Sequence, residues 1–332
     1  MNTSTADITV IICTRNRADS LRVTLEALAR ANREGLRCEL VVVDNGNDPA
    51  TPGVAREFLA AFPVHCLREE TPGKCHAANR ALADAPLGKL VVFLDDDMSP
   101  DANWFQGVKA IADRWPNADL FTGRSHVVWP EAAVPSWCRH PQLRGWAFSV
   151  MGRQQDTPLA SGNWYSGNHF WVRSRVLADG RRFGTHYSST DIQIYTSEPQ
   201  FMLQLVEDGF AGVQGPDAVC GHRIQPGLLR LEDLTERARR AGRGFAVARL
   251  QPFKSSVKQC RLFHDHPWLA RLYCLASLVG WTVWRGLVGL DPRRDQAIPR
   301  RLYAIQRQAT YREYLRVAGA MSEYRLFRSS SR

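Results

Sequence analysis

The sequence lacks several short patterns that would assign it to a common class of protein. Its eight cysteines include no pair at the C-x-x-C spacing of zinc sites and redox motifs. The N-terminus has no apolar run long enough for a signal peptide, because Asp7 precedes the short run 8–13. We therefore expect reduced cysteines and a cytoplasmic location.

Two common nucleotide-binding signatures are also missing. A P-loop requires the pattern G-x-x-x-x-G-K-[ST], but Gly73 and Lys74 are followed by Cys75, and Arg68 stands where the first glycine belongs. A dinucleotide-binding fold requires glycines after the first strand, and residues 14–20 contain none. Both absences argue against a P-loop ATPase and a nicotinamide-dependent dehydrogenase.

The composition is that of an ordinary globular protein. Hydrophobic residues make up 44% of the 332 residues and charged residues 23%, without internal repeats or low-complexity tracts. These values exclude disordered, collagen-like and coiled-coil chains, and the length suggests about two domains. The formal net charge of +10 implies an anionic partner, which could be nucleic acid, an acidic lipid surface or a phosphorylated substrate.

Short β-branched runs alternate with helical patterns through the first hundred residues. Apolar residues at helical spacing separate the runs, as in Leu21, Leu25 and Leu28. This alternation predicts a parallel sheet with helices on both faces. The predicted strands are 8–13, 39–43, 64–67 and 90–94, and the helices between them are centred on 21–28, 51–61 and 74–83.

Polar clusters follow three of the predicted strands, at Thr14–Arg15, Asp44–Asn45 and Asp95–Asp97. Ligands of open parallel sheets bind beyond the carboxyl ends of the strands, so we expect these clusters to form one site. Neighbouring carboxylates repel each other and need a cation to share a site. A divalent metal that also binds a diphosphate would meet this need. Strand alternation predicts that Asp95 and Asp97 point the same way and Asp96 the other.

Four of these segments together resemble the family 2 glycosyltransferases of the GT-A fold. Residues 10–17 are similar to the family's opening strand and nucleotide-contacting loop, and 41–46 to its second strand. Residues 73–79 are similar to the segment G-x-x-x-A-R-N, and 94–97, followed by Pro100 and Trp104, to the D-x-D strand end. The resemblance implies a GT-A type, Rossmann-like, mostly parallel sheet with helices on both faces, followed here by a C-terminal helical extension.

The resemblance continues beyond residue 160 with departures from the family pattern. Gly167–Asn168 is similar to the acceptor-side G-N segment, and 219–222 to the strand that ends in a metal-binding histidine, His222. The stretch 197–209 is similar to the helix that begins with the catalytic acidic pair. Glu198 then corresponds to the second acid of the pair, which is the catalytic one, and Ser197 replaces the first acid.

The resemblance implies an inverting, metal-dependent transfer of a sugar from a nucleotide diphosphate donor, with a UDP-sugar expected. It implies Glu198 as the general base, with Asp191 as the rival. The ion, Mg²⁺ or Mn²⁺, would bind Asp97 and His222, with Asp95 beside it. The residues expected at the donor nucleotide are Thr14, Arg15, Asp44, Asn45, Lys74, Asn79, Asp95 and Asp96. The acceptor would be a glycan or lipid-linked hydroxyl in cell-surface polysaccharide or glycolipid assembly.

Several alternatives stay open at this point. The missing acid at position 197 allows a nucleotide-sugar binding protein without transferase activity, and the net charge alone allows a nucleic-acid-binding protein, although we expect no nucleic acid partner. Asp44 could simply form a turn. The aromatic residues Trp164, Tyr165, Phe170 and Trp171 could stack on a sugar or belong to the core.

We expect a glycosyltransferase domain over 1–225, with a nucleotide half near 1–120 and an acceptor half near 121–225, and a basic helical region over 226–332. Residues 268–290 are strongly apolar, but Arg271 and Arg285 leave an uninterrupted part that is too short to span a bilayer. This segment is either an interfacial helix, which would put the protein on the cytoplasmic face of the membrane, or a buried helix. The pattern does not predict an oligomeric state.

Overall fold

The computed structural model describes residues 5–159, 167–185, 197–250, 267–291 and 293–319. These residues form two compact units. The first comprises 5–131, 148–185 and 197–224, and the second comprises 132–147 and 225–319, within the ranges just given.

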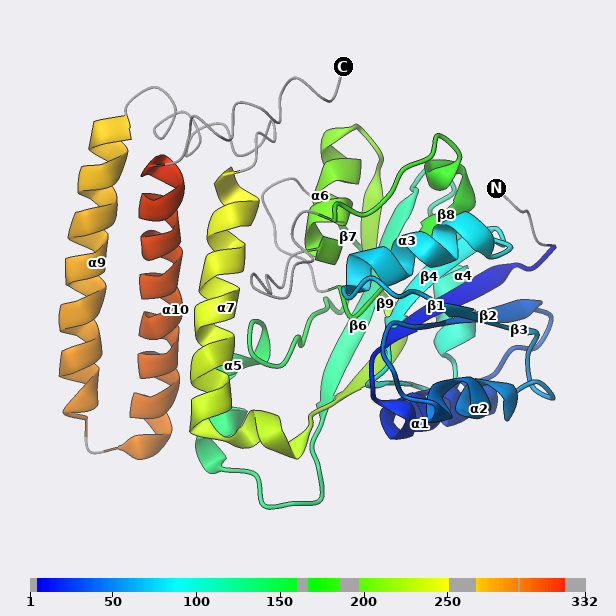
Figure 1. Cartoon of the computed structure of the whole chain (residues 1–332), viewed down its shortest axis with the longest axis horizontal. Coiled ribbons are helices and arrows are strands. Elements are labelled where there is room, and N and C mark those ends of the chain that lie inside the picture. Colours follow the sequence, from blue (N-terminus) through cyan, green and yellow to red (C-terminus); the bar gives the residue numbers. More distant parts are fainter. Residues whose placement is uncertain (1–4, 160–166, 186–196, 251–266, 292, 320–332) are drawn as a thin grey trace. The chain divides into compact units, whose positions relative to one another are not determined.

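A sheet of nine strands forms the centre of the first unit (Figure 1). The strand order is β3-β2-β1-β4-β8-β6-β9-β5, and β7 pairs with β9. The strands are β1 (Ile8–Thr14), β2 (Cys38–Asp44), β3 (Val64–Arg68), β4 (Leu90–Asp95), β5 (Met98–Pro100), β6 (Leu120–Val128), β7 (Thr157–Pro158), β8 (His169–Arg173) and β9 (Gly212–Arg223).

The N-terminal half of the sheet is parallel, as the strand and helix alternation predicts. β1 lies between β2 and β4, and β2 pairs with β3, all in parallel register. The other half is mixed, because β8 runs antiparallel to β4 and β6 while β9 runs parallel to β6. The predicted α/β sheet with parallel N-terminal strands is therefore confirmed.

Helices cover both faces of the sheet. One face packs on α1 (Ala18–Arg30), α2 (Ala50–Arg56) and α4 (Trp104–Arg114), and the other on α3 (Lys74–Asp84) and α6 (Ser197–Glu207). Along β1, Ile8, Val10 and Ile12 belong to the first layer and Ile11 to the second. Strands buried on both faces read as continuous apolar runs, which is why the sequence shows them clearly.

The second unit is helical. Its core joins α7 (Leu231–Leu250), α9 (Pro267–Gly289) and α10 (Arg294–Gly319) through Ala246, Cys274 and Tyr311. α7 and α10 approach closely at Gly242, where an added Cβ would lie 2.1 Å from the carbonyl oxygen of Gln306. The short elements of this unit are η1 (Ser136–Arg139), α5 (Pro141–Arg144) and η3 (Pro226–Leu229), and η2 (Ser174–Leu177) belongs to the first unit.

The expected domain division differs from the observed one at residues 132–147. The sequence analysis assigned this stretch to the acceptor half, but η1 and α5 pack against α10, and the Ser136 hydroxyl donates a hydrogen bond of 2.6 Å to Asp295. A contact between residues so far apart in sequence leaves no local signal.

Helix α9 extends beyond both arginines that interrupt its apolar run. Residues 268–289 are long and apolar enough to cross a membrane, judged by length and composition alone, and only 11% of an apolar 18-residue window within them is buried. The length of the apolar segment, estimated from the part between the two arginines, was therefore too short. Within its own unit α9 is not buried, because large side chains such as Trp268 and Val279 are 62% and 64% exposed.

The first unit buries one histidine that should make its stability depend on pH. Burial lowers the pKa of His169 on β8 to about 4, and a nearby Ala218 carbonyl offsets this only in part. Because the folded-state pKa lies below the ordinary 6.5, the unfolded chain binds more protons as the pH falls through this window.

We expect the free energy of unfolding to drop by about 2 kcal/mol between pH 7 and pH 5 through His169 alone. The variant His169→Gln does not titrate there and should lose that part of the slope. Urea titrations of both proteins at the two pH values measure the difference. Parallel pH dependence in wild type and variant would contradict it.

Candidate active site

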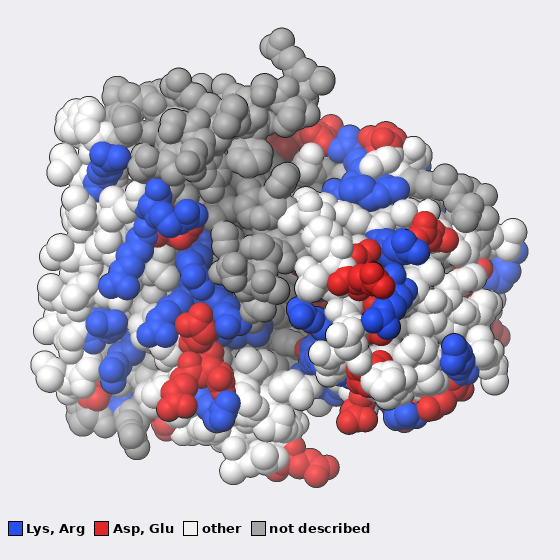
Figure 2. Space-filling view, in the orientation of Figure 1, with Lys and Arg blue, Asp and Glu red and all other residues white. Residues whose placement is uncertain are grey.

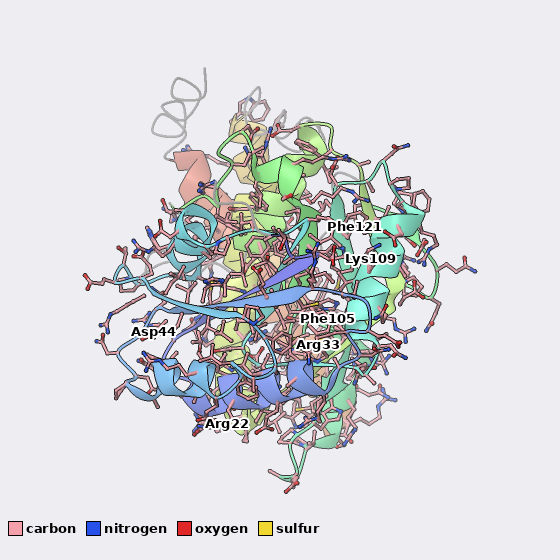
Figure 3. All side chains as sticks on the ribbon, turned by 90° about the vertical axis from the view of Figure 1, so that its right-hand side faces the viewer. Arg22, Arg33, Asp44, Phe105, Lys109 and Phe121 are labelled. Atoms are coloured by element: carbon pink, nitrogen blue, oxygen red, sulfur yellow. The ribbon has the colours of Figure 1, made fainter. Side chains whose placement is uncertain are left out.

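The parallel register brings the polar strand ends to one edge of the sheet. Thr14 pairs with Asp44 across β1 and β2, and Cys13 pairs with Asp95 across β1 and β4. Figure 3 shows Asp44 on the other side of the view from the core residues Phe105 and Phe121. The edge expected to bind a ligand therefore exists.

β4 ends at Asp95, and the next two residues form a turn. The expected alternation of the three carboxylates therefore stops there. Asp96 is buried, accepts a hydrogen bond of 2.7 Å from the Thr14 hydroxyl and forms an ion pair of 2.8 Å with Arg17. Arg17 also binds Asp97 at 2.9 Å, so a single guanidinium joins Asp96 and Asp97.

After the turn, β5 pairs with β9 in a register that places Asp97 beside His222. Met98 lies opposite His222, and the Arg223 N–H donates to the Asp97 carbonyl at 2.9 Å. His222 Nδ1 lies 2.7 Å from the Phe148 carbonyl oxygen. Since that oxygen can only accept, Nδ1 carries a hydrogen and Nε2 faces Asp97 Oδ1 at 3.6 Å.

This pair has the chemistry of a metal site. Asp97 Oδ1 is buried without a hydrogen-bond partner, and His222 Nε2 points at it. Two such atoms attract each other only when a proton or another cation lies between them. Burial alone would raise the pKa of the Asp97 carboxyl, but His222 and Arg17 hold it below its usual value. The carboxylate thus stays charged, as a metal ligand must.

No cluster of three metal-ligating side chains occurs among the residues that the structure describes. Mg²⁺ sites in enzymes often use one or two protein ligands and complete the shell with water and substrate phosphates. Asp97 and His222 fit such a site.

A second group at this edge joins Asp95 to the first turn of α6. Lys74, the first residue of α3, forms ion pairs with both Asp95 and Glu198. Burial raises the pKa of Asp95 to about 7, and Lys74 lowers it only in part. Burial would lower the pKa of Lys74, but the two carboxylates raise it well above its ordinary value. Lys74 therefore remains a cation that links Asp95 to Glu198.

The position of Glu198 depends on a glycine in the loop before β8. An added Cβ at Gly167 would lie 2.5 Å from the Glu198 Cβ. Lys74 and Glu198 also border a small, mainly apolar pocket with Cys13, Cys75 and Phe183. The Glu198 carboxylate thus combines partial burial with a fixed position, which suits a proton acceptor.

Comparison with known proteins finds a family match for the part of this arrangement that carries Asp95 to Asp97. The family model described as Glycosyl transferase family 2 matches residues 9–147. Residues 9–147 are a family 2 glycosyltransferase domain. The resemblance noted in the sequence is confirmed, and the chain is a glycosyltransferase.

Known glycosyltransferases are similar over most of the chain. Glycosyltransferase AglE of Haloferax volcanii is 24% identical over 239 residues, which are 71% of this chain and 72% of that protein. The mannosyltransferase PcManGT of Pyrobaculum calidifontis, solved with GDP-Man and Mn²⁺, is 18% identical, with a TM-score of 0.58 over 93% of this chain and 88% of that one. S. aureus TarS 1–349, solved with UDP, is 18% identical, with a TM-score of 0.51 over 96% and 91%. The two structures show a common fold.

Two residues predicted to contact the donor, Asn45 and Asn79, hold backbone segments of this glycosyltransferase. The Asn45 amide donates to the carbonyls of Glu69 and Thr71 and accepts from the Gly73 N–H. The Asn79 amide donates to and accepts from the backbone of Phe183. Their polarity is used by loops whose approach the sequence does not reveal.

The other predicted residues fall into three groups. Asp44 is buried and accepts from the Gly46 N–H, so it forms the turn that the alternative reading named, at the expected edge of the sheet. The Arg15 side chain is exposed. Asp191, Trp164 and Tyr165 lie outside the described residues.

Of the four aromatic residues considered for sugar stacking, the two that the structure describes, Phe170 and Trp171, belong to the core. Phe170 stacks on Phe93, and Trp171 stacks on Phe121, each inside the sheet layers. A sugar-stacking role for Phe170 and Trp171 is therefore excluded.

Arg223 is a site residue that the sequence analysis missed. Its guanidinium donates to the carbonyls of Asp96, Met98 and Ser20 at 3.1, 2.5 and 2.8 Å and to the Thr24 hydroxyl at 2.8 Å. The Ser20 and Thr24 hydroxyls donate to the same Asp96 carbonyl. Arg223 thereby fixes the turn that carries Asp96 and Asp97. Only its place directly after His222 could have indicated this role.

We expect Arg223→Lys to weaken Mn²⁺ binding about tenfold or more, because a lysine keeps the charge but loses the planar set of donors that orients the turn. The matched control is Arg173→Lys. Arg173 also donates to three backbone carbonyls, those of Ala112, Trp115 and Ala118, but at the opposite end of the sheet. EPR titrations with Mn²⁺, with and without UDP, should separate the two variants. Equal Mn²⁺ affinity in both would refute the positioning role.

Proposed function

We propose that the protein is an inverting glycosyltransferase that uses a nucleotide diphosphate sugar and a divalent metal. The observation that carries this proposal is the pairing of Asp97 and His222 at the strand ends, with Glu198 held by Lys74 beside it. The two similar structures were solved with GDP-Man and Mn²⁺ and with UDP, which agrees with a donor of this class. We retain a UDP-sugar as the expected donor.

The donor would lie over the edge formed by Thr14, Asp44 and the turn at Asp96. Arg17 and Lys74 are cations at this edge whose partners are carboxylates. A diphosphate is a stronger anionic acceptor than a single carboxylate, so both side chains can turn to it. A divalent ion at Asp97 and His222, when bound, supplies charge that stabilises the leaving diphosphate.

Glu198 would accept the proton of the acceptor hydroxyl. The hydroxyl oxygen then forms a bond to the anomeric carbon as the bond from that carbon to the diphosphate breaks. A single displacement of this kind inverts the configuration of the anomeric carbon. Asp191 remains the rival base.

The acceptor is proposed to be a hydroxyl of a glycan or lipid-linked saccharide in cell-surface polysaccharide or glycolipid assembly. The proposed location is the cytoplasm, at the cytoplasmic face of the membrane.

Replacing the base should affect the chemical step. We expect Glu198→Gln to lower kcat by about 10²–10⁴-fold, because the amide cannot accept the proton. Gly167→Ala keeps the carboxylate but displaces it, and should lower kcat as well. Glu207→Gln, at the far end of the same helix, is the matched control. Turnover by Glu198→Gln near that of the control would transfer the role to Asp191.

Replacing the metal ligand should remove both binding and transfer. We expect Asp97→Ala to lower transfer at least about 100-fold and to abolish the Mn²⁺-dependent part of the thermal stabilisation by nucleotide sugars. Asp101→Ala, an exposed aspartate just after β5, is the control. Thermal shifts with UDP- and GDP-sugars, with and without Mn²⁺, measure binding separately from turnover. Full metal-dependent stabilisation of Asp97→Ala would contradict the assignment.

A further inference from the structure

Helix α9 has the reverse of the polarity expected for a helix on a water-exposed surface. Large apolar side chains of α9 point outward and are 44–64% exposed. We call this set the outer arc, and it comprises Trp268, Leu272, Leu275, Val279, Val283, Trp284 and Leu287. Helices at the surface of globular proteins normally point charged and polar residues outward. An apolar surface of this length marks a site that another phase or partner covers.

The inward face of α9 packs on its own unit. Ala270 and Cys274 are buried there, and the Arg285 guanidinium donates to the Gln308 side chain of α10 at 3.1 Å. The Thr282 hydroxyl accepts a hydrogen bond of 3.0 Å from the same glutamine. Arg285 and Thr282 are thus used toward the protein, while Arg271 near the start of the helix is exposed.

The width of the outer arc distinguishes between possible occupants. At 3.6 residues per turn, the exposed apolar side chains from Leu275 to Trp284 cover about 180° of the helix circumference. A partner helix in a coiled coil contacts a narrow seam of two positions per heptad. A lipid phase contacts the whole exposed side of a helix that lies in it, so the broad arc favours lipid.

The charge of the surrounding unit also favours a lipid surface, and an anionic one. Residues 226–332 contain 21 of the 43 Lys and Arg residues but only 8 of the 33 Asp and Glu residues. Figure 2 shows basic side chains gathered beside the largely uncharged surface over α9. Each basic residue near an anionic membrane contributes about 1 kcal/mol of attraction.

Packing along α10 argues for an orientation in the membrane plane. α10 contacts α9 and carries the exposed residues Arg301, Arg312 and Arg316. If α9 crossed the bilayer with this packing intact, those arginines would enter the hydrocarbon, at a cost of about 2.5 kcal/mol or more each. An in-plane helix instead buries one face by about 5–10 Å and leaves its neighbours at the headgroups.

We propose that α9 binds an anionic membrane surface in the plane of the bilayer, with its outer arc among the upper acyl chains. This membrane contact does not depend on the catalytic assignment. If the proposed function is also correct, the site works beside a lipid surface, and a lipid-anchored acceptor becomes the matching substrate class.

The test uses the full chain and preformed vesicles of either phosphatidylcholine alone or equal parts phosphatidylcholine and phosphatidylglycerol. Wild type should co-float with the anionic vesicles and less with the neutral ones. The triple variant Leu272→Glu, Val279→Glu, Val283→Glu should bind about 100-fold more weakly, because three partly inserted side chains are lost.

The matched control changes three exposed apolar residues elsewhere, Val23→Glu, Leu59→Glu and Leu231→Glu, which are 40%, 56% and 45% exposed. It changes the net charge by the same amount and should bind like wild type. Light scattering after gel filtration gives the competing result. A dimer that the α9 variant dissociates, without binding to vesicles, would show that a second copy covers this face and would overturn the proposal.

Depth separates an in-plane helix from a spanning one. The probe is Val279→Trp, at the middle of α9, in a Trp268→Phe, Trp284→Phe background, compared with that background alone. Lipids brominated near the headgroup should quench the added fluorescence more than lipids brominated near the chain ends. Stronger quenching by the deep bromines would refute the in-plane orientation. Sugar-transfer assays on the same variants test the proposed function separately. Vesicle binding without any transfer activity would contradict the proposed function and leave the membrane contact standing.

Discussion

Parallel pairing of β1 with β2 and β4 is the constraint on which the candidate site depends. It ends the strands in step, so that Thr14, Asp44 and Asp95 reach the same edge. The apolar residues of these strands are buried on both faces of the sheet. A slip of one residue in register would move each side chain to the opposite face, where it does not fit the packing, and would therefore be costly. The positions of the polar residues at the edge therefore follow from the burial of the apolar residues before them.

The site uses that edge for two linked charge clusters. Arg17 joins Asp96 and Asp97, and Lys74 joins Asp95 to Glu198, so adjacent carboxylates of one turn serve different partners. The turn at Asp96 is held by three hydrogen bonds to its carbonyl oxygen, which come from Ser20 and Thr24 of α1 and from Arg223 of β9. Such preorganisation leaves Asp97 Oδ1 and His222 Nε2 facing each other, and this is the feature of the chain best suited to a cation.

The helical unit follows a different physical rule. In the sheet unit, most apolar residues are buried, and the exposed ones such as Val23 and Leu59 are scattered singly. In α9, a whole run of large apolar side chains is exposed, and the membrane contact proposed above would explain it. An enzyme of this kind can bind a water-soluble donor at one unit and present itself to a lipid surface through the other.

The four parallel strands β1 to β4, the three helices between them, the three polar strand ends and the family resemblance could be predicted from the sequence, because strand burial and strand-end polarity are local patterns. Tertiary structure decided the rest. The side chains of Asn45 and Asn79 bind the backbone of neighbouring loops. Arg17 and Arg223 belong to the site through contacts with residues 79 to 203 positions away in the sequence. Such contacts depend on where the backbone returns in space, and no spacing in the chain encodes that.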